Sequence, residues 1–410
     1  MNPFHLSHVP FNFPHAQTKS LLSLTSSDQK SERPNSTLLA GSLMDKGFIK
    51  ILSGWTKRGR LEFCLGADMG CSGVRYVLQD FLDPTRSLIL PHAKASCALE
   101  VYESMDTLKS TLGKHFPDFL CRGTVFASAG LRQGDSVLLE NWVGPKAERT
   151  IKPSRFPPEL YPKGHSILMN DLEAAAHGLC SMSESGILDE YFVQMAGPKG
   201  PVLSDRTAFM GMGSGLGTAI IIRNRRNRIP VVLSTEFGYL QAAQPGHRSP
   251  KYKCDSEIME KTANHFYAGE LMPCYEDLAS GRGLRFLYQQ MTGRDVDGKT
   301  VARYAKEGER EAAEALLHHY RFFYKYASTV ARTMQCGSVV MGLSNQVMNH
   351  WFVAAHHKDL VREFLDSPNR IPTTHIRLFT QHRDINFNLA GAAWMADFIA
   401  RNPITSLPPT

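Results

Sequence analysis

Apolar positions along the chain follow two patterns, short continuous runs and longer stretches with helical spacing. The short runs at 61–65, 73–78, 123–127 and 165–169 are rich in apolar residues and predict strands. The longest helical pattern covers 308–335, where apolar side chains recur at steps of three and four residues and predict a core-facing stripe. Strands that alternate with helices in this way predict an α/β fold.

Two further helices are predicted, at 171–182 and 391–401. The first begins at Asn170 and Asp171, either of which can cap a helix by accepting backbone N–H bonds. One face of this helix is apolar and consists of Leu172, Ala175, Ala176 and Leu179. From residue types alone, Asn170 and Asp171 are therefore interpreted as a helix cap.

The segment 207–222 combines an apolar run, a glycine-rich turn and a second apolar run. Its glycines alternate with other residues, at Gly211, Gly213, Gly215 and Gly217. Such a turn lets backbone N–H groups converge on an anion without interference from Cβ atoms. The residues that follow, 219–222, favour a strand, whereas a dinucleotide or Walker loop opens a helix. The pattern predicts a β-hairpin whose tip binds phosphate groups, and a glycine turn without a ligand is the open alternative.

A similar turn lies between Gly66 and Arg75. Asp68 precedes the turn, while Ser72 and Arg75 follow it. A carboxylate beside a phosphate-binding turn suits Mg²⁺, and the hydroxyl and guanidinium groups suit a phosphate. A surface hairpin with a solvated Asp68 is the alternative. Because the two turns belong to different halves of the chain, together they predict a nucleotide held between two domains.

Composition limits the class of protein. The chain has 410 residues, of which 42% are hydrophobic and 21% charged, so it is globular rather than disordered or fibrous. The length predicts two or three domains. The apolar run at 207–222 is interrupted by four glycines and falls short of the roughly 20 apolar residues of a membrane span. The eight cysteines lack metal-site or redox spacing, which favours free thiols in a reducing compartment.

Net charge is mildly basic, at +7. A basic run after the second glycine turn is interpreted as a solvated hairpin tip rather than a nucleic-acid site, because no aromatic residues accompany it; it comprises Arg223, Arg225, Arg226 and Arg228. Two adjacent histidine pairs, His318–His319 and His356–His357, lack metal-ligand spacing and are expected on solvated helix surfaces.

The first 45 residues differ from the rest of the chain. The stretch 1–27 contains no acidic residue and is rich in serine. It lacks a basic start followed by an apolar run, so it is not a secretory signal. A disordered tail and an organelle-targeting segment both remain open.

The motifs resemble those of the sugar kinase, hsp70 and actin superfamily, and within it the bacterial-type and trypanosomatid glucokinases. The resemblance extends over about residues 60–400. The segments that carry it are Ala67–Arg75, Pro162–Ala174, Glu190–Phe192, Gly213–Gly217, Thr235–Gly238 and Tyr275–Leu284.

The resemblance implies a two-domain actin-like ATPase fold, of the ribonuclease H-like type, with a central cleft between the domains. A small α/β domain would comprise 60–172 and 386–402, and a large one 173–385. Residues 1–59 would form an N-terminal extension, either disordered or a targeting segment. ATP and Mg²⁺ are the implied cofactors, with phosphoryl transfer to the 6-hydroxyl of glucose or a related hexose as the implied reaction.

Site residues follow from the same resemblance, position by position. Asp171 would be the general base that takes the proton of the attacking hydroxyl. The residues implied to bind the sugar are Asn141, Asn170, Glu236 and Glu276. The residues implied to bind the nucleotide are Asp68, Gly70, Ser72, Arg75, Gly213, Ser214, Gly215 and Gly342. Asp68 would also hold Mg²⁺ through water.

Several positions depart from the family pattern. Cys71 replaces a glycine of the first phosphate turn, Tyr239 stands where bacterial members have histidine, and Gly342 alone remains of the small residues in the adenosine motif. These departures keep a second hypothesis open: a catalytically weakened or inactive relative that acts as a sugar- or nucleotide-binding or structural component.

Partners and location are expectations of the same kind. We expect glucose or a related hexose and ATP as partners, no nucleic acid and no membrane, with a homodimer as one oligomeric state that the family allows. A cytoplasmic location is the first expectation, with the glycosome and the mitochondrion as alternatives.

Overall fold

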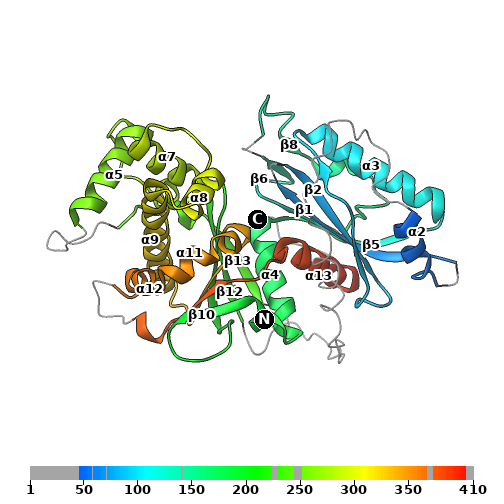
Figure 1. Ribbon diagram of the computed structural model, residues 1–410. Helices are drawn as coiled ribbons and strands as arrows, with labels where there is room; N and C mark the ends of the chain where they lie inside the picture. Colours follow the sequence, from blue (N-terminus) through cyan, green and yellow to red (C-terminus); the bar gives the residue numbers. More distant parts are fainter. Residues whose placement is uncertain are drawn as a thin grey trace, which may run out of the picture.

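The computed structural model describes residues 46–402, with gaps at 58, 71, 140–141, 224–229, 244–251 and 367–372. The described chain forms two lobes, each built around one six-stranded sheet (Figure 1). Helices and strands alternate along most of it, which confirms the predicted α/β class.

The first sheet has the strand order β3-β2-β1-β5-β9, with β4 paired to β2. Its strands are β1 (Glu62–Gly70), β2 (Gly73–Asp80), β3 (Ser87–Ile89), β4 (Ala93–Lys94), β5 (Leu120–Ser128) and β9 (Ser166–Asn170). β1 and β2 form an antiparallel hairpin that turns between Gly70 and Gly73. Gly73 has φ +135°, and a Cβ there would lie 2.1 Å from the carbonyl oxygen of Ala93, so this turn requires glycine.

The second sheet has the order β10-β15-β14-β11-β12-β13. Its strands are β10 (Phe192–Ala196), β11 (Arg206–Met212), β12 (Leu216–Ile222), β13 (Val231–Thr235), β14 (Ser338–Gly342) and β15 (Arg377–Gln381). The predicted glycine hairpin is β11–β12, in which Met212 pairs with Leu216. A small third sheet flanks the first lobe and comprises β6 (Leu131–Gln133), β7 (Ser136–Leu138) and β8 (Thr150–Ile151).

The second lobe carries most of the helices (Figure 1). The α-helices are α2 (Lys46–Ser53), α3 (Ala98–His115), α4 (Asp171–Glu184), α5 (Tyr252–Tyr267), α6 (Tyr275–Ala279), α7 (Gly281–Thr292), α8 (Gly298–Lys306), α9 (Arg310–Thr333), α10 (Ser344–Met348), α11 (His350–Ala355), α12 (His357–Leu365) and α13 (Phe387–Arg401). Short 3₁₀ turns are η1 (Pro153–Arg155), η2 (Leu188–Tyr191), η3 (Phe237–Tyr239) and η4 (Thr373–His375). As its apolar period predicts, α9 lies in the core, with buried Leu316, Tyr320, Tyr324 and Ala327.

Helices α4 and α13 lie side by side at the middle of the molecule (Figure 1). They pack at backbone distance, since a Cβ on Gly391 of α13 would lie 1.7 Å from the carbonyl oxygen of Ala174 in α4. The same helix approaches the first sheet over Gly66 of β1, where a Cβ would lie 2.7 Å from the backbone nitrogen of Ala393. The last helix among the described residues therefore returns to the first lobe and packs between its sheet and α4.

Two expectations need correction. The N-terminal extension does not reach residue 59, because α2 and Trp55 pack into the core of the first lobe with Leu52 fully buried. Residues 1–45 lie outside the described residues. The histidines His318 and His319 are buried at 6% and 4% exposure rather than solvated, because α9 is covered on nearly all sides.

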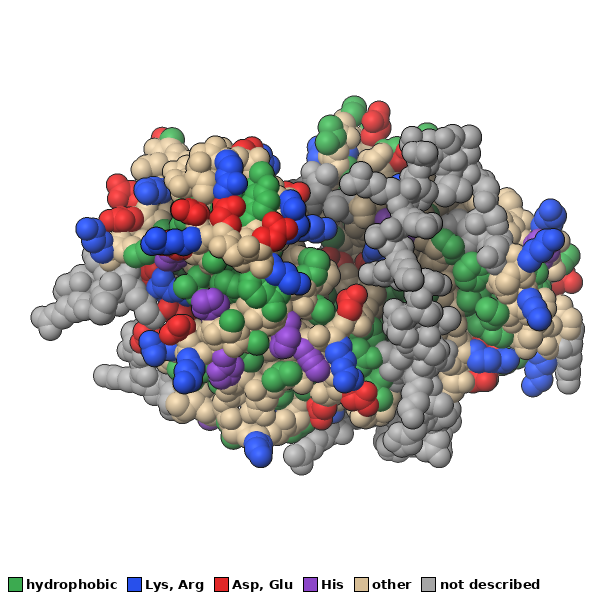
Figure 2. All heavy atoms as spheres, viewed as in Figure 1, with side chains coloured by type: hydrophobic (Ala, Val, Ile, Leu, Met, Phe, Trp, Pro, Cys, Tyr) green, Lys and Arg blue, Asp and Glu red, His purple; other side chains and the backbone are tan. Residues whose placement is uncertain are grey.

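Figure 2 shows acidic and basic side chains interspersed over the visible face of the helical lobe. Many are paired, as Arg285 is with Asp295 at 2.5 Å and Arg303 with Glu307 at 3.5 Å. Such exposed pairs add little stability. The cysteines within the described part of the chain are free thiols, as expected. Across the same residues, no helix is both long and apolar enough for a membrane span.

Candidate active site

The candidate residues gather where parallel strands end. In the first sheet β1, β5 and β9 are parallel, so their carboxyl ends bring Asp68 and Asn170 to one edge. In the second sheet β11, β14 and β15 are parallel, and their ends carry the glycine hairpin and Gly342. In α/β sheets this edge is the usual position of a ligand site.

Asn170 and Asp171 join β9 to α4. Asn170 caps the helix, because its Oδ1 accepts the backbone N–H groups of Leu172 at 2.9 Å and Glu173 at 3.3 Å. Asp171 is the first helical residue, and its Oδ1 accepts the N–H of Leu172 at 2.8 Å. The cap predicted from residue types is therefore Asn170. Since Asn170 meets the structural need, the carboxylate of Asp171 is not required to cap the helix.

Asp68 is held by two asparagines that sequence inspection missed. Its Oδ2 accepts the Nδ2 amide of Asn386 at 2.8 Å, and its Oδ1 accepts that of Asn388 at 3.1 Å. Arg75 approaches Oδ2 to 3.8 Å. Asp68 is 9% exposed. A side chain this buried and oriented by two amides is not the solvated residue of a surface hairpin, which removes the alternative interpretation of the first turn.

The tip of the β11–β12 hairpin is Gly213, Ser214 and Gly215. The backbone N–H of Gly213 donates to the carbonyl of Gly215 at 2.8 Å, which closes the turn. Gly213 and Ser214 are exposed, and a Cβ on Gly213 would meet no heavy atom within 4 Å. The Gly213 carbonyl in turn accepts the N–H of Gly281, the first residue of α7, at 2.9 Å. The tip is thus held by a hydrogen bond from the start of α7, while the space beside Gly213 is open.

Glu276 lies in the first turn of α6 and reaches the same hairpin. Its Oε2 accepts the backbone N–H of Leu216 at 3.0 Å, and a Cβ on Gly215 would lie 3.0 Å from that oxygen. A Cβ on Gly238, two residues after Glu236, would lie 3.4 Å from it. Glu276 therefore sits beside the η3 turn that follows Glu236, although 40 positions separate the two glutamates.

Electrostatic effects tie the carboxylates together. Burial raises the pKa of Asp171 to about 6, and the negative charges of Asp68 and Glu236 add to this increase. Burial also raises the pKa of Tyr326, with further contributions from Glu236 and Glu276. Asp68 and Glu236 thus both act on Asp171, and Glu236 and Glu276 both act on Tyr326. Such mutual repulsion at one place is typical of functional sites.

Other candidate residues take different positions. Ser72 and Arg75 are exposed next to the first turn, and Gly70 is the last residue of β1. Gly342 is buried at the end of β14, where a Cβ would lie 2.7 Å from the ring of Phe209. Asn141, like Cys71, lies outside the described residues.

A sequence model of the glucokinase family matches residues 65–342. The chain belongs to the glucokinase family. The match begins in β1, before Asp68, and ends at Gly342, so it includes both glycine turns and strands of both sheets, but not β15 or α13. Curated relatives extend the similarity over most of the chain. Glucokinase 1 of Trichomonas vaginalis is 38% identical, over 87% of this chain and 98% of its own length. Probable glucokinase 2 of the same organism is 36% identical, over 88% and 100% respectively.

Solved structures of glucokinases have the same fold, a two-domain actin-like ATPase fold. The glucokinase of Balamuthia mandrillaris in complex with glucose has a TM-score of 0.78 at 26% identity, covering 86% of this chain and 99% of its own. The Leishmania braziliensis glucokinase has a TM-score of 0.68 at 21% identity, covering 84% and 94%. The expected family and fold class are therefore confirmed for this glucokinase-family chain.

The sequence around Asn386 and Asn388 did not distinguish a helix cap from a role at the site. The segment 384–388 reads as a polar start to the last helix, and Asn386 does cap α13 by accepting the N–H of Leu389 at 2.9 Å. Nothing in that local pattern points to a carboxylate 318 positions earlier. The two asparagines reach Asp68 only because α13 packs back against β1.

Proposed function

We propose that this chain transfers the γ-phosphoryl group of MgATP to the 6-hydroxyl of glucose, with Asp171 as the general base. Family membership carries the activity, and the residue roles are our proposal. The observation that carries these roles is the environment of Asp171, whose pKa is raised by burial and further by the charges of Asp68 and Glu236. The domain limits, 60–172 with 386–402 and 173–385, are part of the same proposal, and α2 would join the first domain because Leu52 packs into its core.

The chemistry of Asp171 suits a base. A carboxylate whose pKa is raised to about 6 by burial is ionised at pH 7 and still accepts a proton more readily than an ordinary aspartate. Phosphoryl transfer otherwise requires positioning and charge stabilisation rather than covalent catalysis. Asp171 therefore needs only to lie within hydrogen-bond reach of the sugar hydroxyl as it attacks.

Phosphate groups would bind at the open hairpin tip. Gly213, Ser214 and Gly215 offer backbone N–H groups and a hydroxyl, and the tip is held rigidly through Gly281. Ser72 would contribute a second hydroxyl from the opposite turn, beside Gly70, and Arg75 a positive charge. Gly342 would bind the nucleotide from the end of β14, where it pairs with Gly211 of the strand that leads into the tip.

The residues around Asp68 fit a magnesium ion. Mg²⁺ prefers oxygen ligands and usually keeps several waters. The two amides leave lone pairs of the Asp68 carboxylate unused, and the buried Oδ1 of Asn388 has no hydrogen-bond partner within the described part of the chain. Asp68 would hold the ion through water. When bound, Mg²⁺ neutralises phosphate charge during transfer.

Glucose would be bound by Asn141, Asn170, Glu236 and Glu276. The capping bonds of Asn170 use only its Oδ1, so its Nδ2 amide can donate to a sugar hydroxyl. Glu276 uses Oε2 for the hairpin N–H, so its Oε1, which lies 3.9 Å from Nη2 of Arg282, can accept from a sugar hydroxyl. Carboxylate and amide groups of this kind bind vicinal hydroxyls with directional hydrogen bonds.

A coupled assay of ADP formation tests the proposal, using purified protein, glucose and MgATP. We expect glucose-dependent ADP production and saturable binding of both ligands by calorimetry. Binding of glucose without ADP formation would support the inactive-relative hypothesis for the phosphate site. Absence of both activity and ATP binding would refute the proposed function.

A further inference from the structure

Asp277, next to Glu276, is a completely buried carboxylate with an unusually full set of donors. Its Oδ2 accepts the backbone N–H of Cys274 at 2.9 Å, the Tyr267 hydroxyl at 2.7 Å and the Cys274 thiol at 3.1 Å. Its Oδ1 accepts Nη2 of Arg282 at 2.6 Å. After burial, the Asp277 carboxylate itself raises the pKa of Tyr267 and Cys274, so both keep the protons that they donate.

These contacts fix a helix too short to be stable alone. α6 has five residues, and isolated helices of that length do not persist in water. Asp277 and Cys274 form a reciprocal cap at its start. Glu276 projects from the same turn, so the direction of its side chain depends on this cap.

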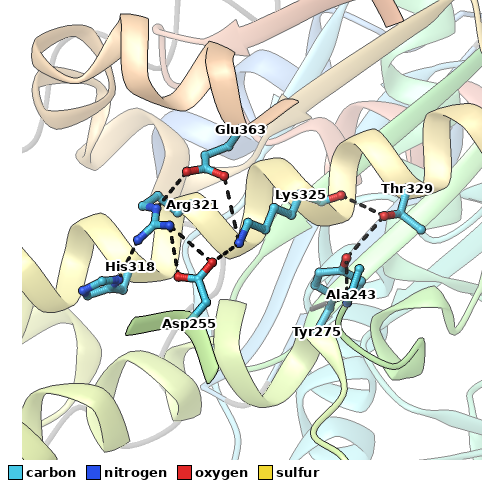
Figure 3. Close-up of polar contacts among 8 residues, drawn as sticks. All are labelled: Ala243, Asp255, Tyr275, His318, Arg321, Lys325, Thr329 and Glu363. Carbon is cyan, nitrogen blue, oxygen red and sulfur yellow. Dashed lines mark hydrogen bonds and ion pairs between the residues drawn. The ribbon is translucent and has the colours of Figure 1, made fainter. Parts of the chain in front are cut away.

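Tyr275, the residue before Glu276, is anchored to α9 through its hydroxyl group (Figure 3). Its hydroxyl accepts the backbone N–H of Ala243 at 3.2 Å and lies 3.3 Å from Oγ1 of Thr329. Thr329 donates to the carbonyl of Lys325 at 3.0 Å. Glu276 is therefore flanked in sequence by two buried, hydrogen-bonded residues, Tyr275 and Asp277.

Arg282 lies next to both Asp277 of this cap and the carboxylate of Glu276. Its Nη2 lies 2.6 Å from Asp277 and 3.9 Å from Oε1 of Glu276, and its guanidinium stacks 4.8 Å from the Phe266 ring centre. The preceding residue, Gly281, holds the hairpin tip through Gly213.

We propose that Asp277, together with Arg282, is a positioning residue for glucose binding that acts through the Glu276 carboxylate. This inference rests on the proposed role of Glu276 in gripping the sugar. The pair fixes the orientation of a side chain that would hold glucose equally in the ground state and the transition state. Its loss should therefore raise KM for glucose and leave kcat nearly unchanged.

Asp277→Asn is the selective test. The amide oxygen can still accept the three donors of the cap, while the amide nitrogen faces Arg282 and breaks the ion pair. We expect a rise of about tenfold in KM for glucose, with kcat and the Kd of a nonhydrolysable ATP analogue within about twofold of wild type. Arg282→Gln breaks the same pair from a half-exposed position that tolerates substitution, and should give the same change.

Asp80→Asn is the matched control. Asp80 is also fully buried and paired with a partly exposed arginine, Arg86, but in the first sheet on β2. The Asp80→Asn variant should lose about as much thermal stability as Asp277→Asn, with no change in KM for glucose. If Asp80→Asn raised that KM as much as Asp277→Asn, general destabilisation would explain the effect and the inference would be overturned.

A double-mutant cycle separates this inference from the proposed function. If Asp277 acts through Glu276, the double variant with Glu276→Gln should have the same KM for glucose as Glu276→Gln alone. Wild-type KM in Glu276→Gln would refute the sugar role of Glu276. A raised KM in Glu276→Gln, with wild-type KM in both Asp277→Asn and Arg282→Gln, would refute the positioning role alone.

Discussion

Asp68 in β1 adds to the increase that burial causes in the pKa of Asp171, which directly follows β9, although the two carboxylates lie 103 positions apart in the chain. The two carboxylates affect each other because β1, β5 and β9 are parallel and end at one edge. Burial is the larger cause, and Glu236 adds to the effect from the second sheet. The pKa of Asp171 is therefore raised first by its burial and then by carboxylates from both sheets.

The first prediction concerns pH. A base with a pKa of about 6 is protonated below that value, so kcat/KM for glucose should fall about tenfold per pH unit below about pH 6. The rate should be level from pH 7 to 8. A pH profile at saturating MgATP measures this. An acid limb near pH 4, the ordinary range of an aspartate, would mean that the group is not Asp171 in the environment described.

The second prediction concerns the support of Asp68. Asn388→Ala removes one amide from the carboxylate, a hydrogen bond to a charged group that contributes about 1.5–3 kcal/mol. We expect the Mg²⁺ concentration that half-saturates binding of an ATP analogue to rise about tenfold, measured by calorimetry across a Mg²⁺ series.

Asn386→Ala is the informative comparison for that variant. Asn386 also caps α13, so its replacement should lower the free energy of unfolding by about 1 kcal/mol in addition. Asn388 accepts no capping bond, so Asn388→Ala should lose only the contribution of its hydrogen bond to Asp68. If binding of the ATP analogue depended on Mg²⁺ in both variants as it does in the wild type, Asn386 and Asn388 would not support a cation site at Asp68.

The third prediction contrasts two glycines. Gly213→Ala places a Cβ in open space at the hairpin tip, so stability should change by less than about 0.5 kcal/mol while KM for ATP rises several-fold. Gly391→Ala places a Cβ against the Ala174 carbonyl and should cost about 3 kcal/mol or more of folding free energy. Thermal denaturation and ATP titration separate the two effects. Unchanged ATP kinetics in Gly213→Ala would argue against phosphate binding at the tip.

Local patterns accounted for much of the fold. Alternating glycines between two apolar runs predicted the β11–β12 hairpin, because strand and turn preferences act over a few residues. The apolar period of 308–335 predicted α9, to within two residues at each end. A cap at Asn170 or Asp171 was predicted for the same reason, since capping involves only the next three residues, and Asn170 is the one that forms it.

Features that depend on long-range packing were missed or wrong. Helix α2 was assigned to the extension because its apolar pattern, which includes Leu52, is only two turns long. His318 and His319 were expected in solvent because adjacent polar residues cannot reveal that both faces of α9 are covered. The roles of Glu276 and Asp68 required either the family resemblance or the packed structure, since each depends on partners far away in sequence.

The most direct test of the account is Asp171→Asn. As the base, Asp171 should contribute about 10²–10⁴-fold to kcat, so the variant should lose that much activity and still bind glucose with nearly wild-type affinity. Its raised pKa means that ionised Asp171 destabilises the fold as pH rises through about 6. Asp171→Asn should therefore melt at or above the wild-type temperature at pH 8, with the difference shrinking toward pH 5. Near-wild-type kcat, or a large loss of stability at pH 8, would contradict the assignment of Asp171 as the catalytic base.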